Sequence, residues 1–80
     1  MSNKHDLVQW LFEALKAHNG SSRIVPLFKH IWENHENELR KAGDLFYTWQ
    51  YDARWAATKL RNEGKMKSAT ISPKGIWELN

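Results

Sequence analysis

The chain contains no cysteine, which excludes a disulfide framework and any metal site built on thiolates. It also has no run approaching the roughly 18 consecutive apolar residues of a membrane span. The segment from Met1 to Asp6 lacks the apolar stretch of a signal peptide, so we expect a cytoplasmic protein with no membrane partner. A chain of 80 residues without internal repeats can bury one modest core, and we expect a single domain over residues 1–80.

The formal net charge is small, only +3, but the charged residues are unevenly distributed along the chain. The segment up to Leu39 has four basic and five acidic side chains, whereas eight basic and three acidic side chains lie between Arg40 and Gly75. Ten aromatic residues, five of them Trp, supply large side chains for a core and argue against disorder. The sequence therefore predicts a folded domain whose second half is basic.

The first half of the chain shows two helical patterns. Apolar residues recur at spacings of three and four from Asp6 to His18, which predicts an amphipathic helix with Asp6 as cap or first-turn acid. Asn19-Gly20 supplies its stop, and Arg23-Ile24-Val25 is expected to form a brief strand. A second helix is predicted from Pro26 to about His35, with one apolar stripe formed by Leu27, Phe28, Ile31 and Trp32. The charged segment from Glu36 to Asp44 is expected to form a short exposed helix or an irregular link.

A third helix is predicted over residues 48–63, with Thr48 as its cap and Gly64 as its stop. A helical wheel separates its residues into two faces. The face expected to point inward holds Trp49, Ala53, Ala56, Ala57 and Leu60. The face expected to point outward is basic and rich in hydrogen-bonding groups, with Tyr51, Arg54, Thr58, Arg61 and Asn62.

The residues after Gly64 predict a β-hairpin over 65–79, with a strand from Lys65 to Ile71, a turn at Ser72-Pro73-Lys74-Gly75 and a returning strand. Trp55 is expected to pack beneath this hairpin against Ile76 or Trp77. The element order is that of a winged helix-turn-helix, in which the third helix enters a DNA groove and the hairpin, or wing, touches the backbone. We therefore expect a mainly helical α+β fold with three helices, or four if the charged link is helical, closed by a C-terminal wing.

The run Trp55-Ala56-x-x-x-Leu60-x-x-x-Gly64, followed by Lys74-Gly75-Ile76-Trp77, resembles the N-terminal domain of Mrr-type restriction endonucleases. The stretch from Val25 to Trp32 is similar to the second helix of that family, so the resemblance covers nearly the whole chain. It implies a winged-helix fold that binds DNA for a nuclease domain further along the same chain. This chain ends at Asn80 without such a domain, so the resemblance implies no cleavage. It also has Lys65-Met66 where many relatives have an apolar pair.

A physical case for binding DNA stands beside the resemblance. Arg54 and Arg61 are two helical turns apart, so both guanidinium groups are expected to reach phosphates or the edge of guanine. Residues near the helix start can face a phosphate, because free N–H groups and the positive end of the helix dipole favour anions. The expected DNA-binding residues are Thr48, Gln50, Tyr51, Arg54, Thr58, Arg61, Lys65, Lys67 and Lys74. The expected partner is double-stranded DNA, in transcriptional control or in a restriction-type system.

The alternative is a domain for protein interaction or dimerisation on the same scaffold. Exposed aromatic side chains would be its anchors: Tyr47, Tyr51 or Trp55. A group of acidic side chains before the third helix would suit a basic partner: Glu33, Glu36 and Glu38.

Catalysis has no candidate residues in this sequence. His30 and His35 are five residues apart, not the four that place two metal ligands on one helix face, so no metal is expected. Glu63-Gly64-Lys65 copies the Glu-x-Lys of a nuclease site, but the nearest upstream acid, Asp52, lies about three turns away on the same helix. Without a Gly-rich phosphate loop or a thiol nucleophile, we expect neither an enzyme nor a cofactor.

Overall fold

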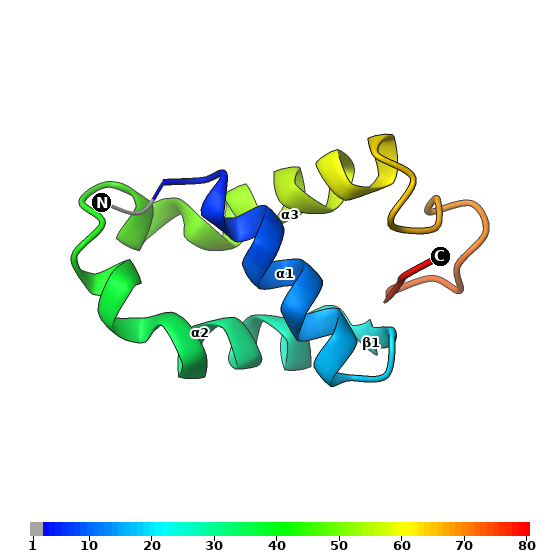
Figure 1. Cartoon of the computed structure of the whole chain (residues 1–80), viewed down its shortest axis with the longest axis horizontal. Helices are drawn as coiled ribbons and strands as arrows, with labels where there is room; N and C mark the ends of the chain where they lie inside the picture. Colours follow the sequence, from blue (N-terminus) through cyan, green and yellow to red (C-terminus); the bar gives the residue numbers. More distant parts are fainter. Residues whose placement is uncertain (1–2) are drawn as a thin grey trace.

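The computed structural model describes residues 3–80, and its first helix, α1, spans Asp6–Ala17 (Figure 1). The Asp6 carboxylate accepts the backbone N–H of Asn3 at 3.0 Å, so Asp6 acts in the first turn and not as the cap. The helix ends where Asn19 and Gly20 adopt positive φ angles of 61° and 88°. The predicted helix is confirmed to within one residue. Its buried face holds Leu7, Trp10, Leu11, Ala14 and Leu15.

A short strand, β1, spans Ser21–Arg23 and leads directly into the second helix, α2, which spans Ile24–Arg40. The strand lies two residues earlier than predicted, because Ile24 and Val25 already belong to the helix. The apolar stripe of the second helix is confirmed at its centre, where Leu27, Phe28 and Ile31 are buried.

The predicted end of the second helix near His35 is confirmed as a break in the helical backbone. His35 has non-helical backbone angles, with φ −133° and ψ 21°, but the chain resumes the helix after it and continues to Arg40. The charged segment thus begins as a short helical stretch up to Arg40, set off by the kink at His35, which is one of the two forms expected for it. Leu39, in this segment, is fully buried in the core, and its burial holds the segment against the rest of the fold.

The third helix, α3, spans Leu45–Asn62 and begins three residues before the predicted start. Thr48 is therefore not its cap, and its hydroxyl donates instead to the Asp52 carboxylate at 2.8 Å. The buried side chain of Leu45 explains the earlier start, because helical backbone there turns this leucine into the core. The predicted stop is confirmed, with φ +76° at Gly64. The predicted inward face is confirmed as well, since its members are all buried: Trp49, Ala53, Ala56, Ala57 and Leu60.

The predicted hairpin is wrong in its pairing. The last strand, β2, spans Ile76–Glu78 and pairs antiparallel with β1, with Ser22 opposite Trp77. The segment from Lys65 to Ile71 forms only one bridge, between Met66 and Leu79. Serine and threonine then take the backbone out of the ladder, because the Ser68 hydroxyl accepts the N–H of Thr70 at 3.2 Å. The ribbon over residues 65–79 thus returns on itself, but most of its outward arm is turn.

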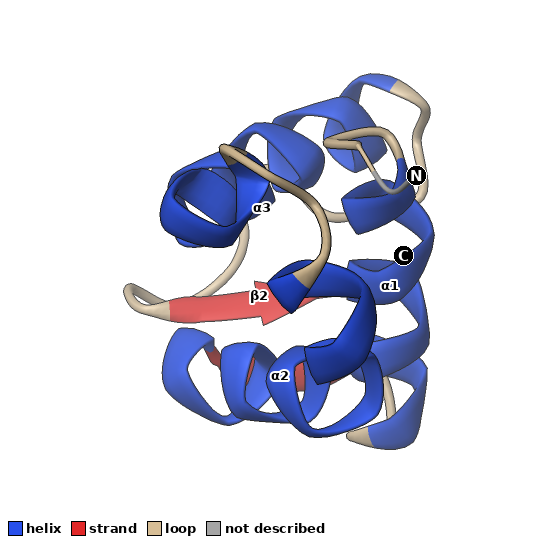
Figure 2. Cartoon of the chain, turned by 90° about the vertical axis from the view of Figure 1, so that its left-hand side faces the viewer, coloured by secondary structure: helices blue, strands red, loops and turns tan. Residues whose placement is uncertain are grey.

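The three helices enclose one core, and the two-stranded sheet closes one end of it. α1 packs against both α2 and α3, and Figure 2 shows β2 passing between α2 and α3. Phe28 of α2 contacts two tryptophans there, with ring centroids 5.5 Å from Trp49 and 6.0 Å from Trp77. The structure is thus a small, mainly helical α+β fold with three helices and a two-stranded antiparallel sheet. None of the helices described over residues 3–80 is long and apolar enough to span a bilayer.

Candidate functional site

The exposed face of α3 carries most of the side chains that the sequence assigned to DNA. Gln50, Tyr51, Arg54 and Thr58 are all exposed, and Tyr51 retains 78% of its surface. The Arg54 guanidinium carbon lies 5.6 Å from the ring centroid of Phe28, so this side chain leans from α3 toward α2. The hydroxyl of Thr48 is exposed too, but its contact with the Asp52 carboxylate places a negative charge beside the helix start. A phosphate is therefore better served by the middle of α3 than by its first turn.

Arg61 does not project freely, which corrects the expectation that both arginines do. Its side chain is half-buried, its Nε donates to the carbonyl oxygen of Lys67 at 3.1 Å, and its guanidinium carbon lies 5.9 Å from the Trp77 ring centroid. Arg61 thus ties the end of α3 to the C-terminal ribbon. Its remaining N–H groups can still meet an anion, since a guanidinium has five donors.

The three lysines of the ribbon are not brought together. The Nζ of Lys65 lies 5.7 Å from the Phe12 ring centroid, on the α1 side, and 3.9 Å from the Glu63 carboxylate. The Nζ of Lys67 lies 3.9 Å from the Glu78 carboxylate. Lys74 is exposed at the turn before β2 and forms no ion pair within residues 3–80. Among these lysines, Lys74 is therefore the one best placed to meet an external anion.

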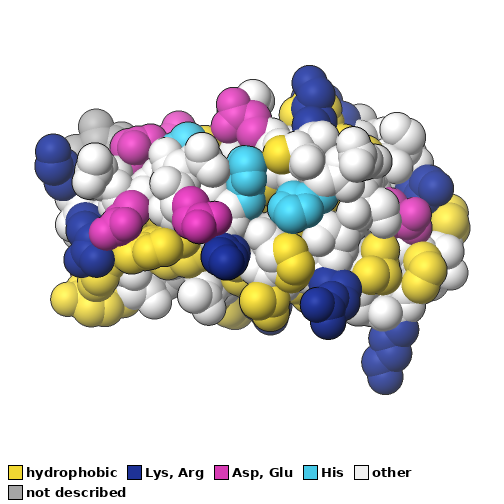
Figure 3. All heavy atoms as spheres, turned by 90° about the horizontal axis from the view of Figure 1, so that it is seen from below, with side chains coloured by type: hydrophobic (Ala, Val, Ile, Leu, Met, Phe, Trp, Pro, Cys, Tyr) yellow, Lys and Arg dark blue, Asp and Glu magenta, His cyan; other side chains and the backbone are white. Residues whose placement is uncertain are grey.

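One further cation at this end of the molecule was missed by the sequence reasoning. Arg23 is exposed and stands opposite Ile76 in the sheet, so it lies close to the turn that carries Lys74. Lys74, Arg61 and Ile76 line the same hollow, of about 420 Å³, between α3 and the ribbon. Figure 3 shows Lys and Arg side chains projecting from this end. The pairing of β1 with β2 brings Arg23 here, and nothing in the local sequence around Arg23 indicates that pairing.

Trp55 was expected to pack beneath the ribbon, but it does not. Its ring lies against the N-terminal segment, with its centroid 5.3 Å from the His5 ring and 4.6 Å from the Nζ of Lys4. Phe28 lies against Trp77 of the ribbon instead. Trp55 therefore covers the start of α1 and lies away from the basic end.

A second surface is an open groove between α2 and α3, which includes some aromatic residues that were expected in the core. Its volume is about 620 Å³, and it is lined by Val25, Phe28, Lys29, Trp32, Phe46, Trp49 and Gln50. Val25 is 76% exposed, and Trp32 and Phe46 are only half-buried. Figure 3 shows hydrophobic side chains gathered along this edge of the molecule, beside Lys and Arg side chains. The stripe pattern could not reveal the groove, because it places Trp32 on the inner face and Phe46 outside the predicted third helix.

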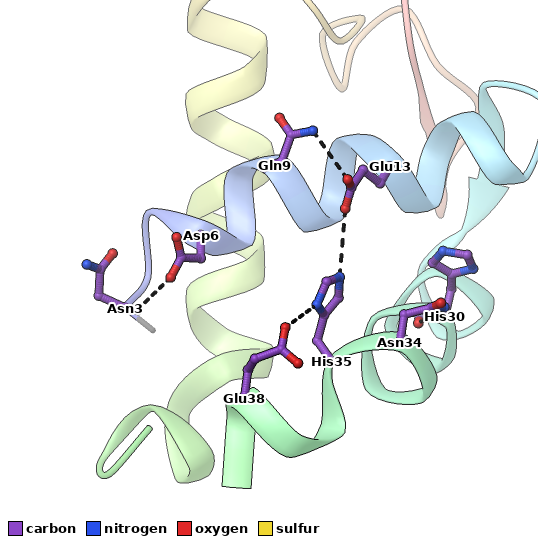
Figure 4. A network of polar contacts seen from close by, with 8 residues as sticks. All are labelled: Asn3, Asp6, Gln9, Glu13, His30, Asn34, His35 and Glu38. Carbon is purple, nitrogen blue, oxygen red and sulfur yellow. Dashed lines mark hydrogen bonds and ion pairs between the residues drawn. The ribbon is translucent and has the colours of Figure 1, made fainter. Parts of the chain in front are cut away.

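A polar cluster joins α1 to the kink of α2 (Figure 4). His35 stacks on Trp10 with ring centroids 4.1 Å apart, and its Nδ1 donates to the Glu38 carboxylate at 2.7 Å. Its Nε2 lies 3.7 Å from the Glu13 carboxylate of α1. The hydrogen bond from His35 lowers the pKa of the Glu38 carboxyl below its usual value. The kink thus turns the ring toward carboxylates on two helices, which gives it a structural role.

We expect Glu38→Gln to remove part of the pH dependence of stability. The folded-state pKa of Glu38 is depressed, so its contact stabilises the fold above the usual carboxyl pKa of about 4.3 and is lost as the pH falls through the lower folded value. Urea midpoints of both proteins should therefore converge as the pH falls from about 6 to below about 4. Glu33→Gln is the control, since Glu33 is exposed and forms no ion pair within residues 3–80. Parallel midpoint curves for Glu38→Gln and the parent would contradict the assignment.

No group of three or more His, Asp and Glu side chains among residues 3–80 is arranged so that it could hold a metal ion. The fold does bring His18 and His30 close, with ring centroids 6.0 Å apart, although they come from different helices. A pair of imidazoles without a third ligand is short of the three protein ligands that a catalytic zinc site uses. The histidines therefore provide no candidate metal centre in this part of the chain.

In comparisons with known proteins, no protein-family model, curated protein or solved structure matches the chain. The candidate sites are therefore the two surfaces described above. One is the basic end with the exposed face of α3, and the other is the apolar groove between α2 and α3.

Proposed function

We propose that this chain is a DNA-binding module of the winged-helix type, without catalytic activity of its own. In this arrangement α3 enters a DNA groove and the ribbon over residues 65–79 acts as the wing against the backbone. The order helix, strand, helix, helix, ribbon supports the assignment, as does the antiparallel pairing of β2 with β1. The resemblance of the sequence to the N-terminal domain of Mrr-type restriction endonucleases favours the same proposal.

The observation that carries the proposal is the position of Arg54 and Lys74. Arg54 is exposed in the middle of α3, one turn from Tyr51 and one turn from Thr58, and forms no ion pair within residues 3–80. Lys74 presents a second unpaired cation from the ribbon. Two unpaired cations on adjacent elements suit a polyanion, because no carboxylate among residues 3–80 pairs with them.

The proposed contacts divide by type. Arg54 and Gln50 are long enough to hydrogen-bond base edges from a helix in the major groove, where Arg suits guanine and Gln suits adenine. Arg23, Arg61 and Lys74 would meet phosphates, which position the module without reading sequence. Lys65 and Lys67 contribute less in this arrangement, because acidic side chains of the same molecule lie beside them. We propose that such binding serves transcriptional control or a restriction-type system in the cytoplasm.

The test is an NMR titration of the isotope-labelled chain with duplex DNA at low salt. We expect the largest amide shifts over Gln50 to Arg61 and Ser68 to Gly75, with a smaller change at Arg23, because these residues form the proposed interface. With about four phosphates contacted, the logarithm of affinity should fall with the logarithm of salt at a slope of roughly −3 to −4. Shifts confined to Glu33–Leu39, or to the groove between α2 and α3, would contradict the proposal and favour a protein-interaction domain.

A further inference from the structure

The groove between α2 and α3 has a continuous aromatic floor, in which Trp32 and Phe46 remain partly exposed. Trp32 stacks on Trp49 with centroids 6.2 Å apart, and Phe46 lies 6.3 Å from Trp32. Tyr47, 84% exposed, extends the aromatic surface at the outer edge, with its ring 5.0 Å from that of Phe46. Aromatic side chains arranged around a hollow are the usual anchors of a protein interface.

Three cationic side chains lie around this groove, one of them, Arg40, paired with the Glu36 carboxylate. Lys29 lines it, and the Arg40 guanidinium carbon lies 5.2 Å from the Trp32 ring centroid and 5.9 Å from that of Phe46. Arg54 lies over Phe28 at the opposite end. No carboxylate is among the residues that line the groove in the described part of the chain. An occupant with apolar anchors and acidic flanks would therefore find both of its features complemented.

Arg40 has donors to spare for such an occupant. Within residues 3–80 its Nε is the one guanidinium nitrogen that forms a hydrogen bond, donating to the Glu36 carboxylate at 2.6 Å. The other N–H groups of the guanidinium can donate to a second carboxylate in the same plane. The aromatic rings beneath Arg40 would lower the local exposure to water and strengthen that contact.

We propose that this groove binds an acidic amphipathic helix of a partner protein. Apolar side chains at i, i+3 and i+4 of the partner lie on the aromatic floor, and its flanking carboxylates meet Lys29 and Arg40. The groove lies away from the proposed DNA contacts of the ribbon, but it adjoins the proposed DNA-contacting face of α3, because Gln50 lines it and Arg54 lies over Phe28 at its end. The module would thus bind a partner protein beside its DNA-contacting face.

The experiment is an NMR titration with a synthetic peptide of about 14 residues, long enough for a marginal helix, with Leu and Phe anchors at helical spacing and Glu elsewhere. We expect amide shifts at Val25 to Trp32 and Phe46 to Gln50, with Lys65 to Gly75 unchanged. A peptide of scrambled order and one with Lys in place of Glu should bind at least about tenfold more weakly. The proposal is overturned if these peptides bind equally well or if no groove amide moves.

Two substitutions make the test specific. Val25→Glu should weaken peptide binding by about tenfold or more while the protein stays folded, because an acid is tolerated in the first turn of a helix. Ile71→Glu is its matched control, since Ile71 is similarly exposed, at 70%, but lies in the ribbon. Lys29→Glu should weaken peptide binding by a similar factor, and Lys59→Glu, an exposed lysine on α3, should not. Equal losses in a variant and its control would overturn the proposal.

The remaining outcomes separate this inference from the proposed function. Val25→Glu and Lys29→Glu should retain most of the affinity for duplex DNA, whereas a loss of DNA binding equal to the loss of peptide binding would make the groove part of a DNA surface. Groove amides that shift with protein concentration alone would identify a second copy of the chain as the occupant. Either result overturns the assignment to an acidic partner helix.

Discussion

Replacing Trp77 with alanine is expected to lower the free energy of unfolding by about 3–5 kcal/mol. Trp77 is 8% exposed, contacts the Phe28 ring, and lies beneath the guanidinium of Arg61. It is also the central residue of β2, so its loss opens the end of the core that the sheet closes. A domain of this size has roughly 5–15 kcal/mol of stability in total, and the variant should therefore be close to unfolding at moderate temperature.

The measurement is urea unfolding followed by far-UV circular dichroism, which does not depend on the fluorescence of the lost indole. Ile71→Ala is the control from the same ribbon, because Ile71 is apolar but exposed, and its effect should stay within about 0.5 kcal/mol. Similar midpoints for Trp77→Ala and the parent protein would mean that the ribbon is not part of the cooperative core.

Reversing the charge of Arg54 and Lys74 together is expected to lower the affinity for duplex DNA by about 100-fold or more at low salt, under the proposed function. Each Arg→Glu or Lys→Glu change removes an attraction to a phosphate and adds a repulsion. Both side chains are exposed and unpaired within residues 3–80, so the thermal midpoint should change little.

Fluorescence anisotropy with a labelled duplex measures this effect. The matched control reverses Lys16 and Lys41, which gives the same net charge from exposed positions on α1 and after α2. If the control lowers the affinity as much as the Arg54 and Lys74 variant, net charge and not the proposed surface governs binding. Arg61 is unsuitable for this experiment, since its contact with the Lys67 carbonyl makes a loss of stability of about 1 kcal/mol part of any result.

Local patterns in the sequence were enough to predict the three helices and most of their buried faces. The leucines of α1, the alanines of α3 and the stops at Gly20 and Gly64 depend on side-chain spacing and on backbone angles that glycine readily adopts. The same patterns also indicated the break near His35. They failed at the start of α3, where Thr48 was expected as the cap, because the burial of Leu45 in the core extends the helix beyond what the local capping preference indicates.

The candidate sites divide in the same way. The exposed face of α3, with Arg54 and Thr58, follows from helical periodicity alone. The pairing of Lys67 with Glu78, and the attachment of Arg61 to the ribbon, depend on how the chain folds back after α3. A charge count along the chain cannot separate a cation that is free from one that is paired.

By itself the sequence determined that three helices form and which side of each is apolar, because these properties repeat every few residues along one segment. Only the tertiary structure decided that β2 pairs with β1 and that Arg23 joins the basic end. It alone also decided that Trp32 and Phe46 line an open groove. These features arise where segments far apart in the chain meet, and no short-range pattern specifies how closely two such segments pack.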